Sequence, residues 1–123
     1  MSQQTILLVE DNTHILDAFT LLLEDSGYRV RAATTGSQAI QSVREAPPDL
    51  VLLDLGLPDM DGLEVVHAIK RDPRAARVPI VALTGHALET DREACLAAGC
   101  AGYLTKPINS TQLLSVLPGF LAA

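Results

Sequence analysis

Several apolar runs of the sequence end in polar side chains of kinds that bind metals and phosphate. The residues at these run ends are Glu10, Asp11, Asp54, Thr84 and Lys106. A single polar residue after an apolar run is ordinary, because the chain must return to solvent there. In an open parallel sheet, however, the carboxyl ends of the strands share one crevice. If the runs are such strands, all five residues meet in one site.

Three carboxylates within a few ångströms repel one another by roughly a few kcal/mol a pair at an effective dielectric constant of about 20. A proton or a cation must offset this repulsion. Mg²⁺ suits such a site, because it takes one or two carboxylates and keeps waters that a phosphate can displace. A carboxylate can attack phosphorus, so we expect Asp54 to be the nucleophile that takes up a phosphoryl group. Lys106 and the metal would neutralise the developing charge, and Thr84 would donate its hydroxyl to a phosphoryl oxygen.

Five segments have the pattern of β-strands. Residues 6–9, 50–53 and 80–83 are continuous apolar runs, which is typical of strands buried on both faces at the centre of a parallel sheet. Residues 28–33 and 101–104 are less apolar, so we expect them to be edge strands.

The segments between these strands have apolar residues three or four positions apart, which is typical of amphipathic helices. Glycine or proline follows each segment and predicts where the helix ends. The fourth helix has only a thin apolar stripe of Leu88, Cys95 and Ala98, and the fifth is expected to end early, at Pro118–Gly119. The helices are predicted near residues 15–23, 39–43, 65–69, 87–98 and 113–117.

The strict alternation of strands and helices predicts an α/β fold with helices on both faces of the sheet. With the second and fifth strands at the edges, the best fit is a single doubly wound, five-stranded parallel sheet of order 2-1-3-4-5, as in flavodoxin-like folds. The 123 residues suit one domain, residues 1–123, without repeats or linkers.

Charge and hydropathy disfavour two classes of partner. Nine basic and fifteen acidic residues give a formal net charge of −6, which is unsuited to gripping nucleic acid. No apolar run approaches the roughly 20 residues that cross a bilayer, and residues 1–4 do not begin a signal peptide. We therefore expect a cytoplasmic protein with no nucleic-acid or membrane partner. Cys95 and Cys100 are too few, and wrongly spaced, for a disulfide framework or a zinc site, so we expect two small buried side chains.

The sequence around the polar residues resembles the receiver domain of bacterial response regulators, the family that includes the chemotaxis regulator. The resemblance runs from about Thr5 to Leu117, nearly the whole chain. It implies a two-component phosphorelay in which a sensor histidine kinase or a histidine phosphotransfer protein transfers a phosphoryl group to Asp54. Such a protein is a signalling phosphoacceptor rather than an enzyme, limited to self-phosphorylation from a donor and slow autodephosphorylation. The matching segments are Val9-Glu10-Asp11, Leu53-Asp54 followed by Pro58 and Gly62, Thr84-Gly85, and Tyr103-Leu104-Thr105-Lys106-Pro107.

The resemblance also implies a ligand set and a peptide conformation. Mg²⁺ is the implied metal, and Mn²⁺ can substitute for it. The Lys106–Pro107 peptide bond is expected to be cis. The implied metal ligands are Glu10, Asp11, Asp54 and the backbone carbonyl of Gly56.

A conformational switch and two surfaces follow from the same resemblance. Tyr103 would rotate inward as Thr84 moves toward the phosphate; from composition alone Tyr103 is a half-buried tyrosine on an edge strand, and both interpretations stay open. The thin apolar stripe of the fourth helix favours a switch nearby, since weakly packed elements are the ones that can move. A downstream target protein would meet the face of the fourth helix, Tyr103 and the fifth helix. The residues expected to contact the phosphodonor are Ile15, Ala18, Pro107 and Ile108.

Two other functions are disfavoured at single positions. A Mg²⁺-dependent phosphatase of the haloacid dehalogenase type needs a second aspartate two residues after the nucleophile, where this chain has Gly56. A flavodoxin-like binding module needs a phosphate-binding loop after the first strand, where Glu10 and Asp11 would repel the flavin phosphate. The sequence leaves open whether the chain is a stand-alone regulator or a receiver excised from a hybrid kinase, and whether it is a monomer or a weak dimer.

The histidines and loop aspartates are less informative. His14 and His86 are not expected to be phosphorylated, because a donor histidine belongs on the helical bundle of a partner. His86 either borders the phosphate or is an exposed residue at a helix start, and His67 is expected on the surface. Asp59 and Asp61 lie in a turn before the third helix, and Asp61 is expected to start that helix.

Overall fold

In the computed structural model, which describes residues 3–85 and 89–121, five strands form one parallel sheet. Their order is β2-β1-β3-β4-β5, so the predicted doubly wound order and both predicted edge strands are confirmed. The strands are β1 (Thr5–Val9), β2 (Arg29–Ala33), β3 (Leu50–Asp54), β4 (Ile80–Thr84) and β5 (Gly102–Thr105).

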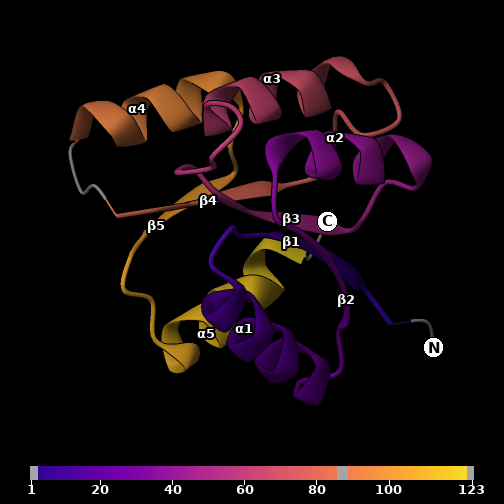
Figure 1. The fold of residues 1–123 in the computed structure, drawn as a ribbon, viewed down its shortest axis with the longest axis vertical. Helices are drawn as coiled ribbons and strands as arrows, with labels where there is room; N and C mark the ends of the chain where they lie inside the picture. The colour runs from indigo at the N-terminus through magenta and orange to yellow at the C-terminus, as the bar shows by residue number, and fades with distance from the viewer. Residues whose placement is uncertain (1–2, 86–88, 122–123) are drawn as a thin grey trace.

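Helices alternate with these strands and cover both faces of the sheet (Figure 1). Two of them, α1 and α5, lie on one face, and α2, α3 and α4 lie on the other, as right-handed crossovers between parallel strands require. The start of the predicted fourth helix, with His86 and Leu88, lies outside the described residues. None of the described helices has the length and apolarity needed to cross a bilayer. The helices are α1 (Thr13–Asp25), α2 (Gly36–Glu45), α3 (Gly62–Arg71), α4 (Glu89–Ala98) and α5 (Ser110–Leu121).

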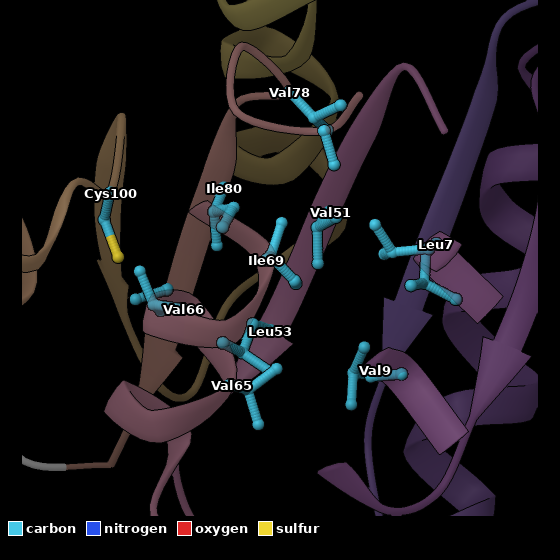
Figure 2. Packing of buried hydrophobic residues seen from close by; sticks show 14 of the residues in the cluster. Leu7, Val9, Val51, Leu53, Val65, Val66, Ile69, Val78, Ile80 and Cys100 are labelled. Carbon is cyan, nitrogen blue, oxygen red and sulfur yellow. The ribbon is translucent and has the colours of Figure 1, made fainter. Parts of the chain in front are cut away.

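Alternating side chains of the central strands form two cores, one on each face of the sheet. On β1, Leu7 and Val9 pack toward α2, α3 and α4, whereas Ile6 and Leu8 pack toward α1 and α5. Figure 2 shows the first core, in which side chains of α3 such as Ile69 lie against β3 and β4. Both faces of the central strands are buried. A slip of one residue in the pairing of a strand with its neighbour would expose apolar side chains, so the two cores fix the residue at which each strand ends.

The C-terminal end of α4 accounts for both cysteines. Gly99 has a φ of 110°, in the left-handed region that favours glycine, and the N–H of Cys100 donates to the carbonyl of Cys95 at 3.0 Å. This is a Schellman-type helix end, in which the residue after the glycine packs back on the last turn. Both thiols are free and buried, and burial raises the pKa of Cys100 to about 12. The prediction of two small buried side chains is confirmed.

The predicted early end of the fifth helix is wrong. The helix continues through Pro118 to Leu121. Phe120 and Leu121 pack on the α1/α5 core, and the Phe120 ring lies so close over β5 that a Cβ on Gly102 would clash with its Cζ. The apolar contacts of this last turn outweigh the backbone hydrogen bond that the proline cannot donate.

Candidate functional site

The polar residues predicted to meet lie at the carboxyl edge of the sheet. Asp54 is the last residue of β3 and Thr84 the last of β4, while Lys106 follows β5. Glu10 and Asp11 follow β1. Parallel pairing of β1 with β3, β3 with β4 and β4 with β5 sets these strand ends side by side.

Three carboxylates converge at this edge. Glu10, Asp11 and Asp54 each offer one oxygen, and these oxygens all lie within 4.8 Å of one another. Glu10 and Asp54 are buried, at 1% and 5% exposed, whereas Asp11 is exposed. An all-oxygen set that is open to solvent on one side suits a hard cation that keeps part of its water, which is the preference of Mg²⁺ and Mn²⁺. The residues therefore fit the predicted metal.

Lys106 supplies positive charge to the same cluster. Its Nζ lies 2.9 Å from Glu10 Oε1 and 3.2 Å from Asp54 Oδ2. Burial lowers the pKa of Lys106, but its hydrogen bonds and charge interactions with Glu10 and Asp54 outweigh burial and raise the pKa above its ordinary value. The ammonium therefore stays charged beside Asp54.

The two buried carboxyls differ in ionisation. Burial, helped by a hydrogen bond with Asp54, raises the pKa of Glu10 to about 7. Burial also acts to raise the pKa of Asp54, but hydrogen bonds from Glu10 and from the Gly56 N–H, together with Lys106, lower it overall. Asp54 therefore favours the carboxylate form, and Glu10 is the member of the pair that takes up a proton more readily.

Both oxygens of Asp54 are held in place. The N–H of Gly56 donates to Oδ1 at 3.0 Å, and Lys106 contacts Oδ2. On the other side of the cluster, the N–H of Asn12 donates to Glu10 Oε2 at 3.3 Å. A fixed orientation of this kind suits a nucleophile, because the attacking oxygen must already point at the incoming group.

The candidate switch residues lie next to the cluster. Thr84 is 4% exposed, and its carbonyl accepts a 2.6 Å hydrogen bond from the backbone N–H of Lys106. Tyr103, on edge strand β5, is half-buried against the core under α2, α3 and α4. The Lys106–Pro107 peptide bond is cis.

An apolar groove adjoins Lys106 on the other face of the sheet. It has a volume of about 370 Å³ and is lined by Ile15, Phe19, Lys106, Pro107 and Ile108. Three of the four residues expected to contact the phosphodonor line it, while Ala18 is exposed on α1 without lining it. Sequence reasoning did not include Phe19, because helical spacing assigns it to the buried face of α1. Phe19 is only half-buried at the edge of that face, and helical spacing alone does not show this.

Three other singled-out polar residues are exposed or cap a helix. His14 on α1 and His67 on α3 are exposed. Asp61 caps α3 by accepting a hydrogen bond from the N–H of Leu63 at 3.0 Å, which confirms it as the start of that helix.

Comparison with known proteins agrees with this geometry. Residues 6–118 match the family model for the response regulator receiver domain. The polar-differentiation response regulator DivK of Brucella ovis is 34% identical over 118 residues, which cover 96% of each chain. A CheY-like response regulator receiver domain protein from Methanospirillum hungatei is 34% identical with a TM-score of 0.90, covering 98% of this chain and 95% of that one. The receiver domain of the sensor histidine kinase PA1611 from Pseudomonas aeruginosa is 38% identical with a TM-score of 0.91, and the match covers 99% of this chain and 100% of that one. That structure was solved with a magnesium ion coordinated in its active site cleft. The chain therefore belongs to the response regulator receiver domain family of two-component signalling proteins.

Proposed function

We propose that this receiver takes a phosphoryl group from a phosphohistidine donor onto Asp54. The observation that carries this proposal is the setting of the Asp54 carboxylate. One oxygen is held by the Gly56 N–H, the other by the Lys106 ammonium, and the carboxyls of Glu10 and Asp11 lie within 4.8 Å. An ionised carboxylate that is oriented and partly neutralised, with exposed Asp11 beside it, is equipped to attack phosphorus.

The transfer exchanges one bond at phosphorus for another. An Asp54 oxygen forms the new O–P bond while the P–N bond of the donor breaks, and the electron pair leaves on the donor's imidazole, which carries its own ring proton. Lys106, 3.2 Å from Asp54 Oδ2, neutralises charge on the transferred group. Mg²⁺ bound by Glu10, Asp11, Asp54 and the Gly56 carbonyl would supply further electrostatic stabilisation, and Mn²⁺ offers the same chemistry.

Phosphorylation would then shift the shape of the receiver. A charge-assisted hydrogen bond from the Thr84 hydroxyl to the phosphoryl group contributes about 1.5–3 kcal/mol. Reversing an equilibrium from 1:99 to 99:1 needs roughly 5.5 kcal/mol. Thr84 alone is therefore insufficient, and contacts of Lys106 or of a bound partner must supply the rest. Rotation of half-buried Tyr103 is the proposed readout of this shift.

Receiver domains interact with histidine kinases and with downstream effectors. For this chain we assign the donor, a histidine kinase or histidine phosphotransfer protein, to the groove of Ile15, Phe19, Pro107 and Ile108 beside Lys106. The target protein is assigned to the face of α4, β5 and α5, where Leu96 is 45% exposed. The chain would act in the cytoplasm as one domain, residues 1–123, and as a monomer or weak dimer.

Intact-protein mass spectrometry after incubation with acetyl phosphate and Mg²⁺ tests the proposal. We expect one added phosphoryl group, absent when EDTA is present and absent in Asp54→Asn. Circular dichroism of the variant checks that it is folded. A phosphoryl group that persists in folded Asp54→Asn, or none on the unaltered protein, would contradict the assignment.

A further inference from the structure

The loop between β3 and α3, residues 55–61, is tied to the N-terminus of α2 by one side chain. Asp59 Oδ1 accepts a hydrogen bond from the Gly36 N–H at 2.8 Å. Its Oδ2 accepts from the Ser37 N–H and from the Ser37 hydroxyl, both at 3.1 Å. These bonds lower the pKa of Asp59, so its carboxylate is ionised at neutral pH.

The helix does not depend on Asp59 for its own cap. Thr35 is the N-cap residue of α2, and its hydroxyl accepts a hydrogen bond from the Gln38 N–H at 3.1 Å. Asp59 instead bonds the N–H groups of the first two helical residues, which have no partner inside a helix. The distinctive contribution of Asp59 is therefore to connect the loop to α2, through bonds to residues that are 22 and 23 positions away in the chain.

Apolar packing closes the same junction. A Cβ on Gly36 would lie 2.5 Å from Met60 Cγ and 2.9 Å from Val65 Cγ2, so the loop and α3 press directly on the first residue of α2. At the other end of the loop, a Cβ on Gly62 would lie 2.7 Å from the Cα of Leu55. Little displacement of the loop backbone is possible while these contacts last.

Gly56 lies between these fixed points. Its N–H holds Asp54 Oδ1 at 3.0 Å, although Gly56 itself is exposed. We propose that Asp59 is a positioning residue for phosphoryl transfer: by tying the loop to α2 it holds Gly56, and through Gly56 the acceptor carboxylate and the metal. This inference rests on the proposed function. The N-terminus of α2 contributes no residue to the site, but under this proposal it helps to hold Asp54 in place.

Mg²⁺ affinity and amide hydrogen exchange, measured on the same variants, test the role. The variants are Asp59→Ala, which removes the tie, and Asp59→Asn, which keeps one oxygen that can accept from Gly36 or from Ser37 and replaces the other with an amide nitrogen that cannot accept. Thr35→Ala is the matched control, because it weakens the same end of α2 without touching the loop. The Mg²⁺ affinity is measured by calorimetry at high ionic strength, because salt screens the exposed charge of Asp59. Loss of the tie is thereby separated from loss of the charge.

We expect the Mg²⁺ dissociation constant of Asp59→Ala to rise about 3- to 10-fold, below the range for residues bonded directly to metal ligands. Asp59→Asn should recover part of the loss, and Thr35→Ala should change the constant less than about twofold. Without metal, the backbone N–H groups of residues 55–57 and 59–61 should exchange faster in Asp59→Ala but not in Thr35→Ala.

The outcomes separate this inference from the proposed function. If the unaltered protein binds no Mg²⁺ and takes up no phosphoryl group, the proposed function fails. If it binds Mg²⁺ and Asp59→Ala binds equally well, only the positioning role fails. A loss in Asp59→Ala that disappears at high ionic strength would assign the effect to charge and overturn positioning. If Asp59→Ala does not fold, Ser37→Ala replaces it, since it deletes only the hydroxyl bond and should show a smaller shift in the same direction.

Discussion

Two neighbouring helices on one face of the sheet are packed very differently. α3 buries Gly62, Val65, Val66 and Ile69, whereas Cys95 is the single buried residue among the described side chains of α4, residues 92–98. The loop before α3 is tied to α2 and holds Asp54 through Gly56. Under the proposed function, the firmly packed α3 side therefore fixes the position of Asp54, and the loosely packed α4 side is the one that can move on phosphorylation.

Lys106 connects the two sides, and replacing it should have the largest effect. It extends from β5 beside α4 and reaches Glu10 and Asp54 at 2.9 and 3.2 Å. If Lys106 stabilises charge on the transferred group, as proposed, Lys106→Ala should slow phosphorylation by acetyl phosphate about 100-fold, measured by mass spectrometry over time. Lys106→Arg is the charge-preserving control and should lose less. A change below about threefold in Lys106→Ala would show that the metal alone neutralises the phosphoryl group.

A pair of apolar truncations compares the packing of the two helices directly. Ile69 on α3 is 1% exposed and Leu96 on α4 is 45% exposed. Ile69→Ala should lower the free energy of unfolding by about 2–5 kcal/mol, because it leaves a cavity in the core. Leu96→Ala should change it by less than about 0.5 kcal/mol, as surface substitutions do. Urea denaturation measures both, and similar losses would mean that α4 is packed as firmly as α3.

The central strands were the part of the molecule most predictable from sequence. Strands buried on both faces appear as unbroken apolar runs, so the sheet order, and with it the convergence of Asp54 and Lys106, could be predicted. The bonds of Asp59 to α2 could not, because they join residues more than 20 positions apart that share no periodic pattern. The length of α5 was also missed. The local penalty of Pro118 is visible in the sequence, but the compensating contact of Phe120 with Gly102 exists only in the folded sheet.

The last turn of α5, which packs over the start of β5, offers the smallest test. Pro118→Ala restores a backbone N–H that can donate to the carbonyl of Leu114, so it should raise the free energy of unfolding by about 1 kcal/mol, less than the ~3 kcal/mol of a helix interior. Gly119→Ala is the matched variant, because a Cβ at Gly119 meets nothing within 4 Å, and it should add about 0.5–1 kcal/mol. Both gains require that residues 118–121 be helical. If α5 ended at Leu117, as its sequence suggests, Gly119→Ala would give no gain, and the face of α4, β5 and α5 would lose one turn of its proposed target surface.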